Sequence, residues 1–341
     1  MLNWKDWIRS TLRGASMQRR EFLTVLSGAA AWSLGAQAQQ PAVPVIGLLS
    51  SASSHDYEPM IATFRKALGE TGFIEGQNVR IEYRWADEHY DRLPALANQL
   101  VRDQVALILA ASTPAALAAK PVTKTIPIVF AIGGDPVRTG LVESLSRPGA
   151  NITGAAHINV ETAPKRLELL HELLPSLQIV GLLINPTNPL GRSVEEGVQT
   201  AATSLGLKLQ VLHARTDEEI DAVFASLPEL KVGALVIGTD PLFTSRAEKL
   251  GALSLRSKIP AIYQYRTFTA AGGVMSYGGN IMDSYYHAGL YAGRILKGER
   301  PADLPVQLST KVELFLNLKS AEALGIKPPL SLLGRADEVI E

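Results

Sequence analysis

The sequence predicts an α/β protein of two lobes, each built on an open and mostly parallel β-sheet. The chain has 341 residues, which is too long for one ordinary hydrophobic core and sufficient for two. From Pro41 onward, short apolar runs rich in β-branched residues alternate with helical patterns, and this alternation occurs twice. Nearly continuous apolar strands separated by helices indicate parallel sheets that are covered on both faces.

The first half shows this alternation most clearly at its beginning. A strand at 45–50 is followed by an amphipathic helix at 58–71, in which Ile61, Phe64 and Leu68 share one face and which Gly72 ends. The other predicted strands of this half are 79–83, 106–110 and 126–131, and its other helices are 90–102 and 114–122.

The second half repeats the design without repeating the residues. Its predicted strands are 179–185, 208–213, 234–238 and 261–263, and its predicted helices are 193–205, 217–226 and 245–257.

Two glycine-rich segments mark where the chain passes between the halves. The segment 147–154 is dense in turn residues, and 272–279 reads as a strand ending in a bend before a helix at 283–297. We therefore expect one lobe from 41–157 plus about 273–310, and the other from about 158–272 plus 311–341. A hinge of several crossover segments would join them.

The N-terminal residues 1–38 have the parts of an export signal. Arg19-Arg20 precede an apolar stretch at 22–35, and Ala36-Gln37-Ala38 offers a cleavage site. The pair and the residues after it resemble a twin-arginine motif, with general secretion as the alternative route and a buried N-terminal helix as the alternative structure. Met17 directly precedes the motif, which suggests that it is the true start.

Composition excludes several classes of protein. The formal net charge is zero, so the sequence lacks the basic field that nucleic-acid binding requires. The chain has no cysteine, which excludes disulfides, thiolate metal sites and a cysteine nucleophile. Without a cysteine to carry a lipid anchor, we expect the exported product to be a soluble periplasmic protein.

Candidate binding residues follow the predicted strands, because ligands of open parallel sheets bind beyond the carboxyl ends of the strands. Ser50 and Ser51 follow the first strand, and Ser112 and Thr113 follow the third. Ser112 or Thr113 can cap the helix that begins near Pro114, where free N–H groups would hold a carboxylate. The alternative is a helix cap without a ligand.

Further candidates follow the later strands. Asp135 and Asn185 lie in Pro-containing turns, and Asp240 either neutralises a ligand ammonium from the lobe opposite Ser112 or shapes its own turn. Aromatic residues at strand ends, suited to stacking on a flat ligand or to packing, are Tyr263, Tyr265 and Tyr277.

The sequence carries none of the enzymatic motifs that we considered. It has no GxxxxGK[ST] loop and no GxSxG elbow, its six histidines lack ligand spacing, and Gly133-Gly134 does not match a dinucleotide fingerprint. We therefore expect neither a cofactor nor a bound metal, and no catalytic residue.

Several motifs together resemble those of the ABC transporter substrate-binding family that includes tryptophan- and tyrosine-binding lipoproteins. The resemblance extends over nearly all of residues 43–341, and its motifs are at 130–137, 140–142, 148–154, 181–186, 317–321 and 323–326. It implies a type I periplasmic-binding-protein fold, with Rossmann-like lobes, three crossovers and a ligand in the cleft. The ligand carboxylate would lie at the loop matching Ser112 and Thr113, and Asp240 would meet the amine.

The expected function is therefore that of the periplasmic solute-binding component of an ABC importer. Its ligand would be a small carboxylate-bearing molecule, such as an aromatic amino acid or an aromatic acid, which lobe closure buries. We expect a monomer that delivers this ligand to an ABC permease in the inner membrane and binds no nucleic acid. The alternatives are a periplasmic ligand-sensing partner of a receptor and an exported α/β enzyme.

Overall fold

The computed structural model describes residues 43–341, and residues 44–341 form one compact unit. The predicted export signal, with its arginine pair at Arg19-Arg20 and its start at Met17, lies outside the described residues. Among residues 43–341, no helix combines the length and the apolar character needed to cross a membrane.

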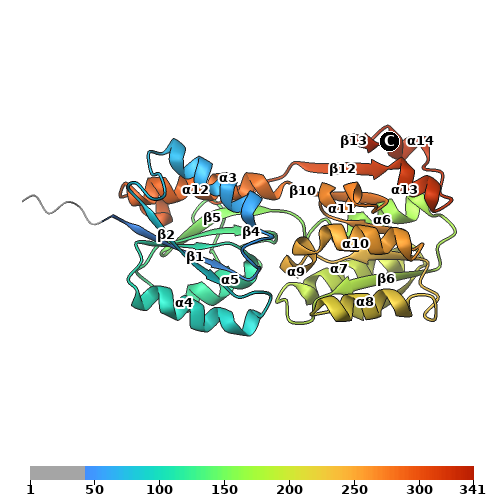
Figure 1. Cartoon of the computed structure of the whole chain (residues 1–341), viewed down its shortest axis with the longest axis horizontal. Coiled ribbons are helices and arrows are strands. Elements are labelled where there is room, and N and C mark those ends of the chain that lie inside the picture. The colour runs from blue at the N-terminus through green and yellow to red at the C-terminus, as the bar shows by residue number, and fades with distance from the viewer. Residues whose placement is uncertain (1–42) are drawn as a thin grey trace, which may run out of the picture. The chain divides into compact units, whose positions relative to one another are not determined.

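Two β-sheets organise this unit, one in each lobe (Figure 1). The first sheet has six strands in the order β11 (Gln307–Ser309), β5 (Ile152–His157), β4 (Ile128–Ile132), β3 (Leu107–Ala110), β1 (Val45–Ser50) and β2 (Arg80–Trp85). The second has seven, in the order β13 (Glu338–Ile340), β12 (Val312–Asn317), β10 (Met275–Gly279), β9 (Ala261–Tyr263), β8 (Ala234–Ile237), β6 (Ile179–Ile184) and β7 (Lys208–His213). All neighbours run parallel except β10 and β12. The predicted α/β class with two mostly parallel sheets is confirmed.

Helices cover both faces of the first sheet. A hydrophobic cluster lies on each face of the sheet, and successive residues of β1 point to opposite faces. Leu48 belongs to the first cluster and Leu49 to the second. The first cluster lies under α3 (Glu58–Glu70) and α12 (Ile281–Leu296), and the second lies under α4 (Leu93–Arg102) and α5 (Thr113–Ala119). Burial on both faces is the reason that these strands read as continuous apolar runs in the sequence.

The second sheet is covered in the same way. Leu182 and Leu183 of β6 enter different clusters, one packed by α6 (Ala163–Leu173) and α7 (Gly191–Ser204), the other by α8 (Asp217–Ser226) and α10 (Ala247–Arg256). Short helices complete the lobe, namely α9 (Pro241–Ser245), α11 (Arg266–Ala270), α13 (Leu318–Ala323) and α14 (Leu330–Leu333). Each lobe therefore has its own core.

The predicted elements match the observed ones where hydrophobic periodicity is strong. The strands at 208–213 and 261–263 and the helix at 217–226 have the predicted bounds. The predicted helix at 245–257 corresponds to α10, which begins at Ala247, and a separate short helix, α9, precedes it from the Asp240 cap to Ser245. Among the elements that the sequence analysis did not predict are β5, β11, β12, α13, α14 and β13.

The chain passes between the lobes at three places, of which the first and third lie near the expected boundaries and the second lies later than expected. After the segment 147–154 the chain continues as β5 in the first sheet, and it crosses only beyond His157. Residues 273–279, expected in the first lobe, instead contribute β10 to the second sheet, because Met275 pairs with Ile262 of β9. The second crossing therefore follows Gly279, and the third joins β11 to β12.

A buried hydrogen-bond network connects the first two crossings. The Oδ1 atom of Asn159 accepts a hydrogen bond from the amide of Gly279 at 2.7 Å. A Cβ atom at Gly278 would lie 2.5 Å from the carbonyl oxygen of Gln264, so only glycine allows this close approach of the backbones. Arg166, fully buried on α6, donates to the carbonyl oxygens of Asn159 (3.0 Å) and Tyr277 (3.3 Å). The crossings are thus held by backbone-directed contacts rather than by a loose linker.

Candidate functional site

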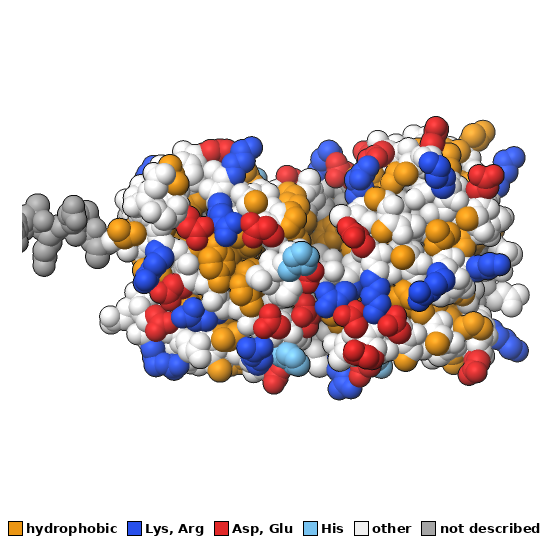
Figure 2. Space-filling view, viewed as in Figure 1, with side chains coloured by type: hydrophobic (Ala, Val, Ile, Leu, Met, Phe, Trp, Pro, Cys, Tyr) orange, Lys and Arg blue, Asp and Glu red, His pale blue; other side chains and the backbone are white. Residues whose placement is uncertain are grey.

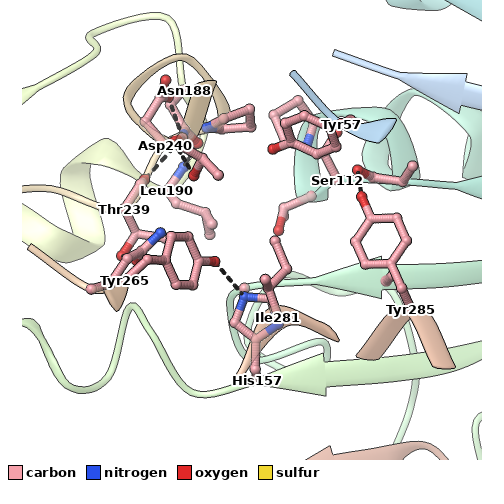
Figure 3. A pocket seen from close by; sticks show the side chains of 18 residues that line it. Tyr57, Ser112, His157, Asn188, Leu190, Thr239, Asp240, Tyr265, Ile281 and Tyr285 are labelled. Atoms are coloured by element: carbon pink, nitrogen blue, oxygen red, sulfur yellow. Dashed lines mark hydrogen bonds between the residues drawn. The ribbon is translucent and has the colours of Figure 1, made fainter. Parts of the chain in front are cut away.

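A pocket lies between the lobes, where strands of both sheets end (Figure 3). Its cavity volume is about 40 Å³, and the empty space among its lining atoms, which includes space open to solvent, is about 400 Å³. Figure 2 shows the surface hollowed between the lobes. The main lining side chains of the first lobe are Tyr57, Ser112, Thr113, His157, Ile281 and Tyr285. Those of the second lobe are Asn188, Leu190, Thr239, Asp240, Gln264 and Tyr265.

The wall of the pocket in the first lobe presents hydroxyl groups. Ser112 is the N-cap of α5, and its Oγ accepts hydrogen bonds from the amide of Ala115 (3.3 Å) and from the Oγ of Ser51 (2.9 Å). Because its oxygen accepts both bonds, the hydroxyl hydrogen of Ser112 is free to donate into the pocket. The next residue, Thr113, also lines the pocket, and its hydroxyl has no hydrogen-bond partner among the described residues.

The two serines after β1 stand behind this wall. Ser51 is fully buried and orients Ser112, whereas the Oγ of Ser50 accepts a bond from the amide of Ala52 (3.2 Å). Neither Ser50 nor Ser51 lines the pocket.

The wall of the second lobe contains a buried carboxylate, that of Asp240. This side chain is 2% exposed and caps α9, with Oδ1 accepting from the amide of Leu242 at 2.8 Å. Burial raises the pKa of Asp240 from 3.8 to about 6, although the hydrogen bonds that it accepts work in the opposite direction. No lysine or arginine lines the pocket in the part of the chain that the structure describes. Asp240 therefore lacks a cationic partner there.

Neutral donors hold the Asp240 carboxylate in place. Asn188 donates to Oδ2 at 2.6 Å, and Asn185 lies behind the pocket with its Nδ2 3.4 Å from Oδ1. Tyr90 comes from the first lobe and donates to Oδ1 at 3.0 Å, which is a direct contact between the lobes. The carboxylate is thus oriented without being neutralised.

His157 closes the floor of the pocket as a neutral group. Its Nδ1 lies 3.0 Å from the Oγ of Ser284, and its Nε2 lies 3.1 Å from the hydroxyl of Tyr265 in the second lobe. Burial lowers the pKa of His157 to about 3, so the ring is uncharged at neutral pH.

Three of the predicted residues lie elsewhere. Asp135 caps its own exposed turn by accepting from the amide of Val137 at 2.7 Å, and it borders a separate hollow with Arg138. Tyr263 is fully buried, with its hydroxyl 3.0 Å from the Oγ1 of Thr244. The side chain of Tyr277 packs against the core of the second lobe. None of these three lines the pocket, because local turn chemistry and core packing already engage them.

Several lining residues were not proposed from the sequence. Asn188 and Thr239 sit in the same strand-end loops as the proposed Asn185 and Asp240, so their positions were a usable signal. His157 ends β5, a strand that was not predicted. Other lining residues without a strand-end signal, which precede or belong to helices, are Tyr57, Ile281 and Tyr285.

Known proteins share both the sequence pattern and the architecture. The sequence pattern of the family described as ABC transporter substrate binding protein matches residues 45–340. A tyrosine-binding protein of Clostridioides difficile (strain R20291) is 29% identical over 265 residues, covering 77% of this chain and 76% of that protein.

Solved structures extend the comparison to the arrangement of the lobes. An ABC domain from Streptococcus pneumonia in complex with L-Trp is 26% identical and superposes with a TM-score of 0.78, covering 88% of this chain and 100% of the other. A ligand-free, open substrate-binding protein from Clostridium difficile is 29% identical, with a TM-score of 0.59 and coverage of 87% and 99%. The fold is thus the type I periplasmic-binding-protein fold, as the resemblance implied.

The matched sequence pattern extends over nearly the whole of the described chain, and the crossings, the paired sheets and the pocket between the lobes agree with it. The chain belongs to the ABC transporter substrate-binding protein family.

Proposed function

We propose that this protein captures a small zwitterionic amino acid with an aromatic side chain between its lobes and delivers it to an ABC permease. The observation that carries the proposal is the distribution of charge in the pocket. Asp240 supplies one carboxylate on the second lobe, Ser112 supplies a free hydroxyl donor on the first, and no basic side chain lines the described pocket.

Charge favours an amino acid over an aromatic acid. A ligand ammonium beside Asp240 would form a charge-assisted hydrogen bond in a buried site, where such bonds are strong. An acid without an amine would instead bring a second negative charge toward Asp240, and no lysine or arginine of the described lining would offset it. The proposed ligand therefore carries both groups.

The remaining lining suits a flat apolar side chain. Tyr57, Tyr265 and Tyr285 present aromatic rings, and Leu190 and Ile281 add aliphatic surface. Apolar pockets with a few well-placed polar groups are typical of small-molecule sites. The tyrosine-binding relative and the complex with L-Trp support this choice of side chain.

Contacts between the lobes support capture by closure. Tyr90 donates to Asp240, and Arg246 of the second lobe forms a 3.1 Å ion pair with Asp56 of the first. The TM-score of 0.78 to the L-Trp complex exceeds the 0.59 to the ligand-free, open protein, although sequence identity is slightly higher to the latter. Ligand binding would shift the population toward the closed form, and no bond would be made or broken. A role in binding without chemistry agrees with the contacts of His157, because its two ring nitrogens are within hydrogen-bond distance of Ser284 and Tyr265.

The proposal includes an extracytoplasmic setting. The N-terminal residues 1–38 carry the pattern of a cleaved export signal, so the mature chain would act as a periplasmic monomer and dock on a permease of the inner membrane.

Titration calorimetry of the mature chain tests the ligand class. We expect L-tryptophan, L-tyrosine or L-phenylalanine to bind with a dissociation constant in the micromolar range or below. Their deaminated and decarboxylated analogues should bind much more weakly, because each lacks one of the two charged groups. Tight binding of a neutral sugar, with no heat for any amino acid, would refute the proposal.

A further inference from the structure

The hydroxyl group of Tyr57, like that of Thr113, lines the pocket without a hydrogen-bond partner among the described residues. Tyr57 is 3% exposed, and its Oη has no hydrogen-bond partner among the described residues. The residue lines the pocket, and Figure 3 shows it on the wall of the first lobe with Ser112, across the cavity from Asp240. Because the residue lines the pocket and its hydroxyl bonds no other described group, this hydroxyl is available to bond a ligand.

The position of Tyr57 is fixed by packing and linked to the Ser112 loop. Tyr57 directly precedes α3, and its carbonyl oxygen accepts from the amide of Ile61 at 3.0 Å. Its ring packs edge-on against Tyr285, with 6.4 Å between the ring centroids. Tyr285 in turn donates to the carbonyl oxygen of Ala111 at 2.7 Å, immediately before Ser112. The two hydroxyl-bearing parts of the wall are therefore connected by direct contacts.

We propose that Tyr57 is a specificity-determining residue, whose hydroxyl donates a hydrogen bond to the carboxylate of the bound amino acid together with Ser112 and Thr113. This inference rests on the proposed function, since it assumes a ligand with a carboxylate. Three neutral hydroxyl donors from one lobe take the place of the basic side chain that the described lining lacks. Burial raises the pKa of Tyr57 well above its ordinary value, so the phenol keeps its proton and acts as a donor.

The arrangement favours the carboxylate over the ammonium as the partner of Tyr57. A ligand ammonium could donate to the phenol oxygen but could not accept its proton, and the second lobe already offers the ammonium the Asp240 carboxylate. A ligand carboxylate accepts several bonds, and all its donors in the first lobe are uncharged. Such a site suits one carboxylate well, but it offers no cation to offset the further charge of a dicarboxylate or a phosphate ester.

The variant Tyr57→Phe tests the inference, because it removes one oxygen and keeps the ring that packs on Tyr285. Calorimetry would compare the best-binding aromatic amino acid with its carboxamide, in wild type and variant. We expect the variant to bind the amino acid at least tenfold more weakly, as is usual for the loss of a bond to a charged group. The carboxamide should lose much less affinity, so the preference for the acid should shrink.

A matched control is Tyr83→Phe, which removes a phenol that bonds Arg65 and Glu75 outside the pocket. This control should bind like wild type. Unchanged affinity of Tyr57→Phe for the amino acid would overturn the inference, as would equal losses for acid and carboxamide. If the carboxamide binds too weakly to titrate, a crystal structure of the complex decides, and a carboxylate oxygen more than about 3.5 Å from the Tyr57 Oη would overturn it. If wild type binds no amino acid, the proposed function itself fails.

Discussion

The two walls of the pocket differ in the kind of polar group that they offer. The wall of the first lobe offers uncharged hydroxyls from Ser112, Thr113 and Tyr57, whereas the wall of the second offers the carboxylate of Asp240 with supporting amides. Donors on one side and a negative charge on the other fit a molecule whose two ends differ in the same way. If the proposed function holds, the contrast teaches that recognition is divided between the lobes and that closure assembles the complete site.

The largest expected effect comes from removing the charge of the second wall. Asp240→Asn keeps an oxygen that can cap α9 but loses the negative charge that the ligand ammonium would meet. We expect affinity for the amino acid to fall on the order of 100-fold in calorimetry, since a bond between charged groups is lost. The variant should unfold at the same or a higher temperature, because an uncompensated buried charge has been removed.

Asp135→Asn is the control for this change, since it makes the same substitution at an exposed turn outside the pocket. If Asp240→Asn bound the amino acid with wild-type affinity, the ligand ammonium would not be recognised by the second wall as proposed.

Lowering the pH should reversibly reduce the affinity for the amino acid, because Asp240 loses its charge. Burial raises the pKa of Asp240 to about 6, so most of its charge is lost at pH 5, and affinity there should be about tenfold lower than at pH 7.5. The effect on folding has the opposite sign. Because the folded pKa lies above the ordinary value of 3.8, the contribution of this group to stability is full below about pH 4 and is lost as the pH rises through about 6.

Calorimetry at the two pH values, with Asp240→Asn alongside, separates this residue from the others. The pKa of His157 is lowered to about 3, so its ring does not titrate within this window. Equal wild-type affinities at pH 5 and pH 7.5 would contradict the role of the Asp240 charge.

The smallest expected effect lies outside both walls of the pocket, at the ion pair between Asp56 of the first lobe and Arg246 of the second, which we call the rim contact. Asp56→Asn removes the charge of the ion pair with Arg246, whose partly exposed side chains limit its strength. We expect affinity to fall about threefold at low salt for every ligand, because only the closed state loses a contact. Titration at high salt should erase the difference.

Asp217→Asn serves as the control for the rim contact, because Asp217 binds Arg246 from within the second lobe and does not bridge the lobes. A change in the ranking of ligands by Asp56→Asn would show that the rim takes part in recognition.

Hydrophobic periodicity was sufficient to predict most of the fold. The continuous apolar strands and amphipathic helices are local patterns, and they predicted both sheets, with β7 and α8 at their observed bounds. The rule that ligands bind beyond the ends of parallel strands selected Ser112, Thr113 and Asp240, which all line the pocket. The same rule also selected residues that do not line the pocket, because a strand end does not reveal whether a side chain faces the cleft or the interior; these are Ser50, Ser51, Asp135, Asn185, Tyr263 and Tyr277.

The sequence by itself therefore determined the two-lobed α/β architecture and the loops that end its strands, since both depend on residues that are close together in the chain. Only the tertiary structure decided which side chains converge. It brought Tyr57 from before α3 and Tyr285 from within α12 to the wall of Ser112, and it buried Asp240 away from any cation of the described lining. The physical reason is that the direction of a side chain, the burial of a charge and the place where the chain crosses depend on packing between segments more than 100 residues apart.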